Sequence, residues 1–302
     1  MRSLLAVLVA IPSVALAQLP DPAKGNVTSE PVAGNVHMLT GVGGNIGVSV
    51  GPDGLLIVDD QFEVLAPKIN KAIDKLSKAK ISYVLNTHYH FDHTGGNGVF
   101  GREGRIVAQR EVRTRLVAGV DMGPMGKIPP AKKEALPVIT YDTGMSLYFN
   151  GEEIRLTHLP AGHTDGDSMV YFVGSNVLHM GDHFFVGAFP FIDLNGGGSV
   201  EGYLANVEKV LATLPQGVKI IPGHGPLAGR AELESFVAAI RESVSLVRAR
   251  RDAGKTLAQV KAEGLPEKFK PWGAGFINQD TWLETVFTSL EKGAKKVSAP
   301  TP

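Results

Sequence analysis

The stretch Thr87-His88-Tyr89-His90-Phe91-Asp92-His93-Thr94-Gly95-Gly96-Asn97 places three histidines and one aspartate within six consecutive positions. Imidazole and carboxylate are side chains that bind zinc and its neighbours in the first transition row. The preceding run, Ile81 to Leu85, is β-rich and predicts a buried strand. If strand geometry continues to His90, His88 and His90 point to the same face, because strand side chains repeat with period two. Asp92 and His93 can face the same point across the turn that the two glycines allow.

Three later segments share one pattern, in which a strand ends and a glycine or polar turn presents an ionisable side chain. They are Leu159–Asp167, His179–His183 and Ile221–Pro226, which carry His163, Asp182 and His224. A glycine beside such a side chain lets the backbone approach a crowded centre.

The composition excludes several classes of protein. The 30 basic and 30 acidic residues balance, so the chain has no electrostatic footprint for nucleic acid or an anionic membrane. It contains no cysteine, which removes any thiolate nucleophile or thiolate ligand and limits a metal site to His, Asp and Glu. The partner that remains is a small-molecule substrate; the oligomeric state is not encoded in any pattern.

Residues 1–17 have the pattern of a signal peptide. Arg2 supplies a positive start, Leu4 to Leu16 is apolar, and small residues end the segment at Ala17. The apolar run is shorter than the roughly 20 residues that span a bilayer, which favours cleavage before Gln18 over an anchor. We therefore expect a periplasmic or secreted protein with no membrane segment after cleavage.

The predicted elements alternate in two similar halves, each running from a β-rich part through a helix and a strand to a second helix. Two packed mixed β-sheets with helices on the outside would satisfy this order, an α+β fold in four layers, αβ/βα, formed by residues 18–302 as one domain. Residues 121–137 have little periodicity and predict a loop near the site. Helices are predicted at 64–76, 111–117, 200–214, 231–251 and 280–292, and strands at 36–39, 46–50, 55–59, 81–85, 105–108, 145–149, 153–159, 169–173, 177–180 and 219–221.

The motif His-x-His-x-Asp-His, with its companions in order along the chain, resembles the full ligand set of the metallo-β-lactamase superfamily. The similarity runs from about Val36 to the helix after His224. It implies two zinc ions: His88, His90 and His163 would bind the first, Asp92, His93 and His224 the second, and Asp182 would bridge them. Asp59 matches an acidic residue of the family that would support a ligand. The pair of metals would supply a hydroxide at neutral pH, which Asp92 could orient or deprotonate as the catalytic carboxylate.

Other ionisable residues have plainer interpretations. His37, His158 and His179 are expected to be structural. His183 adjoins Asp182, so we expect it to support the site or face the substrate without binding metal, since seven ligands already fill a two-metal site. The carboxylates after His163, Asp165 and Asp167, could orient it, although turn carboxylates more often face solvent.

The resemblance indicates the chemistry more strongly than the substrate. We expect a hydrolase that opens a cyclic amide or ester, as β-lactamases do, and export favours this over a glyoxalase II, whose substrate is cytosolic. The alternative is a lactonase or thioesterase without β-lactam turnover, because Asp182 stands where the most studied β-lactamases carry Cys and no Lys follows it. Phe184, Phe185 and Phe189–Ile192 predict an apolar wall for an acyl or hydrophobic substrate.

Different classes of function are also open. One branch of the family uses similar ligands for iron-dependent oxidation, and metal analysis would distinguish it from a zinc enzyme. A non-catalytic zinc protein conflicts with seven ligands, since structural zinc sites are closed and four-coordinate. A nuclease conflicts with the balanced charge.

Overall fold

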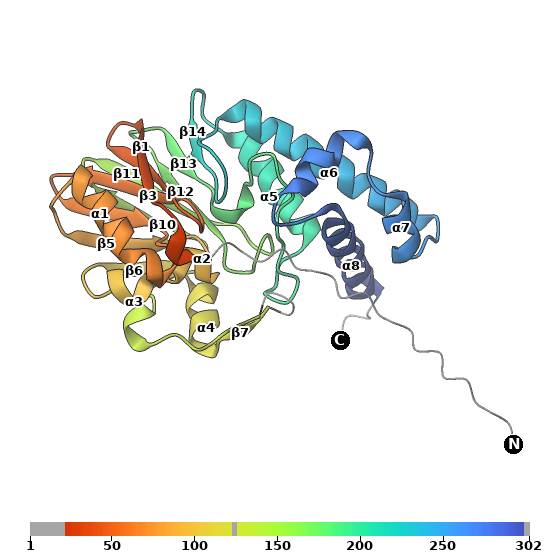
Figure 1. Cartoon of the computed structure of the whole chain (residues 1–302), viewed down its shortest axis with the longest axis horizontal. Coiled ribbons are helices and arrows are strands. Elements are labelled where there is room, and N and C mark those ends of the chain that lie inside the picture. Colours follow the sequence, from red (N-terminus) through yellow and green to blue (C-terminus); the bar gives the residue numbers. More distant parts are fainter. Residues whose placement is uncertain (1–21, 123–125, 299–302) are drawn as a thin grey trace, which may run out of the picture.

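The computed structural model describes residues 22–122 and 126–298 of the chain (Figure 1). The expected signal peptide and its cleavage site lie outside these residues. Among the helices that are described, none has both the length and the apolar character to cross a bilayer.

The first sheet has seven strands in the order β1-β2-β3-β4-β5-β6-β9. The strands from β1 to β4 pair antiparallel, and β4, β5, β6 and β9 pair parallel, so the sheet is mixed. Its strands are β1 (Thr28–Ala33), β2 (Val36–Thr40), β3 (Ile46–Gly51), β4 (Gly54–Val58), β5 (Ile81–Asn86), β6 (Arg105–Gln109) and β9 (Ile139–Tyr141).

The second sheet has five strands in the order β10-β11-β12-β13-β14. It is also mixed, because only the last pair, β13 and β14, is parallel. Its strands are β10 (Gly144–Phe149), β11 (Glu152–His158), β12 (Ser168–Phe172), β13 (Val177–His179) and β14 (Lys219–Ile221), and a separate short pair joins β7 (Val120–Asp121) to β8 (Lys127–Ile128).

The two sheets pack face to face over a core to which both contribute. Leu56, Val58 and Leu85 of the first sheet lie in one cluster with Ile154 and Phe172 of the second, all at most 1% exposed. Burial of such alternate strand residues is what holds two sheets in a sandwich.

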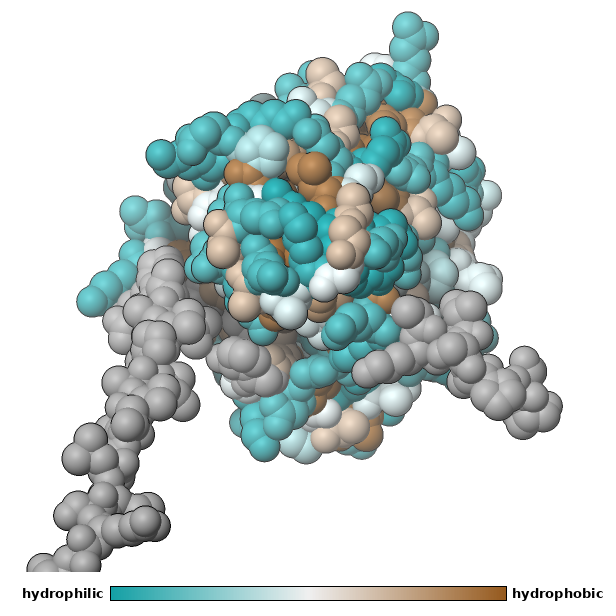
Figure 2. Space-filling model, turned by 90° about the vertical axis from the view of Figure 1, so that its right-hand side faces the viewer, coloured by the Kyte–Doolittle hydropathy of each residue, from teal (hydrophilic) through white to brown (hydrophobic). Residues whose placement is uncertain are grey.

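Helices cover the outer face of each sheet, which completes the four expected layers. On the first sheet, Ile69 and Ile73 of α1 pack on Val48 and Ile57. On the second, the C-terminal helices share a core with β13 and β14, and their outward surface is mostly hydrophilic (Figures 1 and 2). The helices are α1 (Ala66–Leu76), α2 (Phe91–Thr94), α3 (Asn97–Phe100), α4 (Arg110–Ala118), α5 (Val200–Thr213), α6 (Arg230–Asp252), α7 (Leu257–Glu263) and α8 (Gln279–Ser298), with short 3-10 turns that include η5 (Gly181–His183) and η6 (Glu267–Ala274).

The predicted elements correspond closely to these, although the short elements β7, β8, β9, α2 and α3 were not predicted. Three further corrections concern β1, α7 and β5. Strand β1 was not predicted; its backbone pairs with β2 although most of its side chains are exposed. Helix α7 was missed because it is only seven residues long and buries only Val260. Strand β5 ends at Asn86, so the period-two argument for His88 and His90 was wrong.

Candidate metal centre

Four buried side chains from three parts of the chain form the first half of the centre. His88 and His90 follow β5, His163 follows β11, and Asp182 lies in η5 after β13. His163 Nε2 lies 2.8 Å from His90 Nδ1 and 3.3 Å from Asp182 Oδ2, and His88 Nε2 lies 3.9 Å from the same oxygen. One donor atom from each residue lies within 4.8 Å of all the others, so this group could hold a metal ion.

Asp92, His93 and His224 form the second half. His224 Nε2 lies 3.3 Å from Asp92 Oδ2 and 3.4 Å from His93 Nε2. His93 Nε2 also lies 2.9 Å from Asp182 Oδ1. The two oxygens of Asp182 therefore face different halves, which is the position a bridging carboxylate requires. The side chains of Asp92 and His224 are 22% and 31% exposed, so this half is the open side of the centre.

The protonation states fit a cation in both halves. Burial, together with the neighbouring His93, lowers the pKa of His88 well below its usual range, and burial lowers the pKa of His163 to about 4. Both rings are therefore neutral, and His88 Nε2 is buried without a hydrogen-bond partner among the described residues. A buried nitrogen of this kind costs free energy unless a proton donor or a cation satisfies it.

In the open half, neighbouring carboxylates raise the pKa values of the two histidines. Burial opposes the charge of His93 and His224, but the carboxylates of Asp182 and Asp92 outweigh it, raising the pKa of His93 well above its usual range and that of His224 to about 9. The same contacts hold the pKa of Asp92 at about 2 despite its burial. The carboxylates of Asp92 and Asp182 thus favour positive charge here, and a bound divalent metal would take the place of the protons on His93 and His224.

Asp59 contacts the nitrogen of His93 that faces away from the centre. Its Oδ2 lies 2.7 Å from His93 Nδ1, and its two oxygens accept hydrogen bonds from the backbone and hydroxyl of Thr87. Asp59 follows β4 with a φ of 63°, a region few non-glycine residues adopt. The contact orients Nε2 of His93 toward the centre, and the supporting role of Asp59 stays a prediction.

Asp193 is a supporting residue that sequence reasoning missed. Its Oδ2 lies 3.2 Å from His90 Nε2 and accepts a hydrogen bond from the hydroxyl of Tyr89, and its Oδ1 accepts the N–H of Gly196 at 2.7 Å. Burial opposes ionisation, but these donors outweigh it and lower the pKa of Asp193. The sequence signal, an aspartate shortly before three glycines, indicated only a turn.

The residues near His163 differ from their predicted roles. His163 Nδ1 donates to the carbonyl of Phe191 at 2.7 Å, so neither Asp165 nor Asp167 orients it directly. Asp167 is 2% exposed and accepts the N–H of Thr164, so its assignment to solvent was wrong. Asp165 is partly exposed and forms an ion pair with Arg115.

His183 lies outside both groups of candidate ligands. Its ring stacks on Tyr203 at 5.1 Å, and its Nδ1 lies 3.7 Å from Asp167 Oδ2. Burial lowers the pKa of His183 to about 3, so it is neutral. His183 does not line the cavity described below, which disfavours contact with a substrate. That it supports the metal centre through Asp167 remains a prediction. His179 is buried, and its Nε2 donates to the carbonyl of Asn45 at 3.0 Å, which is the structural role expected of it.

Two glycines lie so close to candidate ligands that no side chain would fit between them. A Cβ atom at Gly223 would lie 2.2 Å from Asp182 Oδ1, and one at Gly44 would lie 2.1 Å from Cε1 of His93. Both distances are far below any real contact, so a larger residue at either position would displace a candidate ligand.

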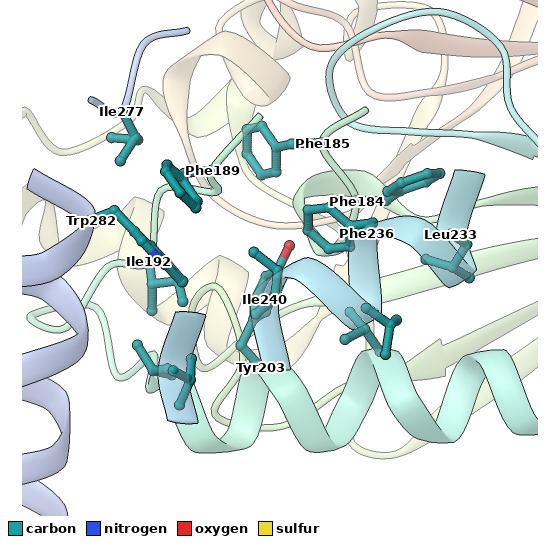
Figure 3. Close-up of a cluster of buried hydrophobic side chains, with 14 of the residues drawn as sticks. Phe184, Phe185, Phe189, Ile192, Tyr203, Leu233, Phe236, Ile240, Ile277 and Trp282 are labelled. Atoms are coloured by element: carbon teal, nitrogen blue, oxygen red, sulfur yellow. The ribbon is translucent and has the colours of Figure 1, made fainter. Parts of the chain in front are cut away.

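The centre opens on a cavity of about 470 Å³, within the range of small-molecule sites. Six phenylalanines are among its described lining residues, and Phe185 stacks on His224 with ring centroids 5.0 Å apart. The predicted apolar wall is confirmed for Phe185, Phe189 and Phe191, whereas Phe184 and Ile192 are part of the core and do not line the cavity (Figure 3). Met122 also lines the cavity, so the predicted loop borders the site.

Comparisons with known proteins agree with this geometry. The family model described as Metallo-beta-lactamase superfamily matches residues 39–226. The chain therefore belongs to the metallo-β-lactamase superfamily. Its fold, its His and Asp cluster and its hydrolase relatives make it a metallo-hydrolase, with a centre for divalent metal.

Individual relatives are distant. The probable metallo-hydrolase YqgX of Bacillus subtilis (strain 168) is 28% identical over 57% of this chain and 83% of its own length. A hydroxyacylglutathione hydrolase of Pelagibacter ubique (strain HTCC1062) is 28% identical over 53% of this chain, which spans only 60% of that relative. The structure of a metallo-beta-lactamase from Pontibacter korlensis shares the fold, with a TM-score of 0.61 and 14% identity over 72% of this chain and 99% of that one.

Proposed function

We propose that this protein is a dizinc hydrolase that opens a cyclic amide or ester, in the manner of a β-lactamase. One observation carries the proposal: seven His and Asp side chains converge in two groups that Asp182 joins, at the end of a cavity large enough for a small molecule. The seven donors include no thiolate, and imidazole with carboxylate suits zinc.

The chain's own residues would hold and orient the reactants. A bound pair of divalent metals lowers the pKa of water and polarises a carbonyl. Asp92 lies on the open side of the centre, so its carboxylate can orient the attacking water and accept its proton. The C–O or C–N bond of the ring breaks, the water oxygen bonds to the acyl carbon, and the proton passes to the leaving oxygen or nitrogen.

A second candidate is a lactonase or thioesterase without β-lactam turnover. It is favoured by the lining of the cavity, where the described residues include no Lys or Arg to pair with the carboxylate of a β-lactam. A hydroxyacylglutathione hydrolase among the relatives is also consistent with ester-type chemistry.

A substrate panel tests both candidates. The protein, purified and loaded with zinc, is assayed on nitrocefin, γ-lactones and an acyl thioester, and its metal content is measured in parallel. Two zinc ions per chain and ring opening of a lactam or lactone would support the first proposal. Turnover of lactones or thioesters but not nitrocefin would favour the second, and iron with no hydrolysis of any substrate would contradict both.

We also propose that the protein is exported and acts in the periplasm or outside the cell, because residues 1–17 have the pattern of a signal peptide. Mass spectrometry of the protein from the producing cell should find Gln18 at the N-terminus, in the periplasmic or extracellular fraction. An intact Met1 in the cytoplasm would contradict export.

A further inference from the structure

The lining of the cavity beside the metal centre is polar at the end formed by the centre and apolar elsewhere. Its ionisable lining residues, among those described, are His90, Asp92, Asp182 and His224, all of which belong to the centre. Every other lining residue is aliphatic, aromatic, proline, methionine or glycine. Small-molecule sites usually place several polar groups around an apolar wall. Here the polar groups gather at one end, and the rest of the cavity can recognise a ligand only through apolar contact.

Packing behind the wall holds it in place. Phe189 stacks on Trp282 of α8, with ring centroids 5.2 Å apart and planes at 10°. Its N–H donates to the carbonyl of Trp272 at 3.1 Å. Figure 3 shows Phe185, Phe189 and Ile277 along one border of this aromatic cluster, with Tyr203 of α5 along the other. The wall is therefore preformed and needs little ordering when a ligand binds.

The segment between η6 and α8 closes the cavity from the C-terminal side. Gly275, Phe276 and Ile277 all line it, although they lie well beyond residue 226, where the match to the family ends. Ile277 is buried, whereas Phe276 is 41% exposed. A large aromatic side chain that lines a cavity while still exposed gains free energy when an apolar group covers it.

We propose that the substrate carries an uncharged alkyl or aryl group beyond the reacting carbonyl, and that Phe276 determines specificity by covering this group. The inference rests on the proposed function, because it assumes that the carbonyl lies over the metal centre. An anionic group in the same position would lose its water without gaining a positively charged side chain, because the described lining residues beyond the centre include no Lys or Arg. The substrate class is therefore a neutral ester, lactone or cyclic amide that carries a lipophilic group.

A chain-length series tests the proposal. The zinc-loaded full chain is assayed with γ-lactones from γ-valerolactone to γ-dodecalactone, with nitrocefin as the anionic comparison. Each methylene that enters the cavity should raise kcat/KM about fourfold, which is roughly 0.8 kcal/mol, until the cavity is full. The variant Phe276→Ala should flatten this dependence, and Phe276→Leu should retain part of it.

A matched control separates Phe276 from a general effect of removing an exposed aromatic ring. Tyr148 on β10 is 77% exposed and does not line the cavity. Tyr148→Ala should leave the chain-length dependence unchanged. Thermal unfolding of all three variants establishes that each is folded, and an equal loss of chain-length dependence in Tyr148→Ala would contradict the assignment of Phe276.

A binding measurement distinguishes failure of the inference from failure of the proposed function. Both tryptophans of the chain, Trp272 and Trp282, lie against Phe189, so their fluorescence should change when 1-hexanol, 1-octanol or 1-decanol fills the cavity. Hydrolysis with equal efficiency at all chain lengths, or a preference for nitrocefin, would overturn the inference and leave the hydrolase. Alcohol binding that strengthens with chain length, without hydrolysis of any substrate, would overturn the proposed reaction and support the apolar site. Neither binding nor hydrolysis would overturn both.

Discussion

Oδ2 of Asp59 lies 2.7 Å from Nδ1 of His93, on the side of the ring that faces away from the metal centre. Asp59 reaches this position from a backbone with positive φ, which asparagine adopts readily. The contact fixes which nitrogen of His93 faces the centre, and such supporting carboxylates strengthen metal binding by a ligand.

The variant Asp59→Asn should therefore weaken zinc binding in the open half by about 10- to 100-fold while the chain stays folded. Competition with a chromophoric chelator measures the affinity. The matched control is Asp142→Asn, an exposed carboxylate that pairs with Arg110. If both variants bind zinc as the unaltered protein does, Asp59 does not support the centre.

Asp193 should strengthen zinc binding in the buried half of the centre, as Asp59 should in the open half. We expect Asp193→Asn to reduce zinc affinity by about 10- to 100-fold, because the carboxylate that faces His90 Nε2 is lost. Tyr89→Phe removes the hydroxyl that donates to Asp193 but leaves the contact with His90, so its loss should be smaller. Chelator competition on both variants checks the order, and a larger loss in Tyr89→Phe would point to packing of the tyrosine as the cause.

Substitution of Asp92 should lower turnover more than it lowers metal binding. Its carboxylate is on the open side of the centre and can orient the attacking water. Asp92→Asn should lower kcat by about 10²- to 10⁴-fold while part of the zinc remains bound. Kinetics on a cleaved substrate, with metal content measured on the same sample, test this, and unchanged turnover would exclude Asp92 from activation of the nucleophile.

The metal-free protein should lose stability as the pH rises. The folded pKa of His224 is about 9, above the ordinary value of about 6.5, because Asp182 and Asp92 outweigh its burial. A raised histidine pKa stabilises the fold fully below about pH 6.5, and this contribution is lost as the pH rises through 9. Tm of the metal-free protein should fall across this window, and zinc affinity should rise because fewer protons compete.

Two histidine variants provide the control. His224→Gln should reduce the pH dependence of Tm, whereas His37→Gln, on β2 outside the centre, should leave it unchanged. A metal-free protein whose Tm stays level between pH 6.5 and 9 would contradict the charge balance described for the open half.

The C-terminal helices should unfold together with the sheets. Trp282 is fully buried, and its indole N–H donates to the hydroxyl of Ser243 at 3.0 Å. Trp282→Ala should lower the free energy of unfolding by about 3–5 kcal/mol, because it leaves a large cavity. The exposed Val138 gives a control, since Val138→Ala should stay within about 0.5 kcal/mol. Denaturant unfolding with two separate transitions would show instead that the helices fold on their own.

Local chemistry explains why so much of the fold and centre could be predicted. The strands of both sheets carry apolar residues in runs or alternation, as in β4 and β12, and such periods are visible without tertiary contacts. The short helix α7 gives too little pattern to detect. The convergence of His88 and His90 was foreseen for the wrong reason, because β5 ends before them and the turn into α2 positions the rings.

The sequence by itself determined the class of fold and which side chains could form a metal centre, because periodicity and ligand chemistry are local properties. Only the tertiary structure decided that Asp182 faces both halves, that Asp193 supports His90 across 103 positions, and that Phe276 closes the cavity. These relationships depend on how two sheets and the C-terminal helices pack. No short-range pattern records that packing, since it is set by the burial of apolar surface over the whole chain.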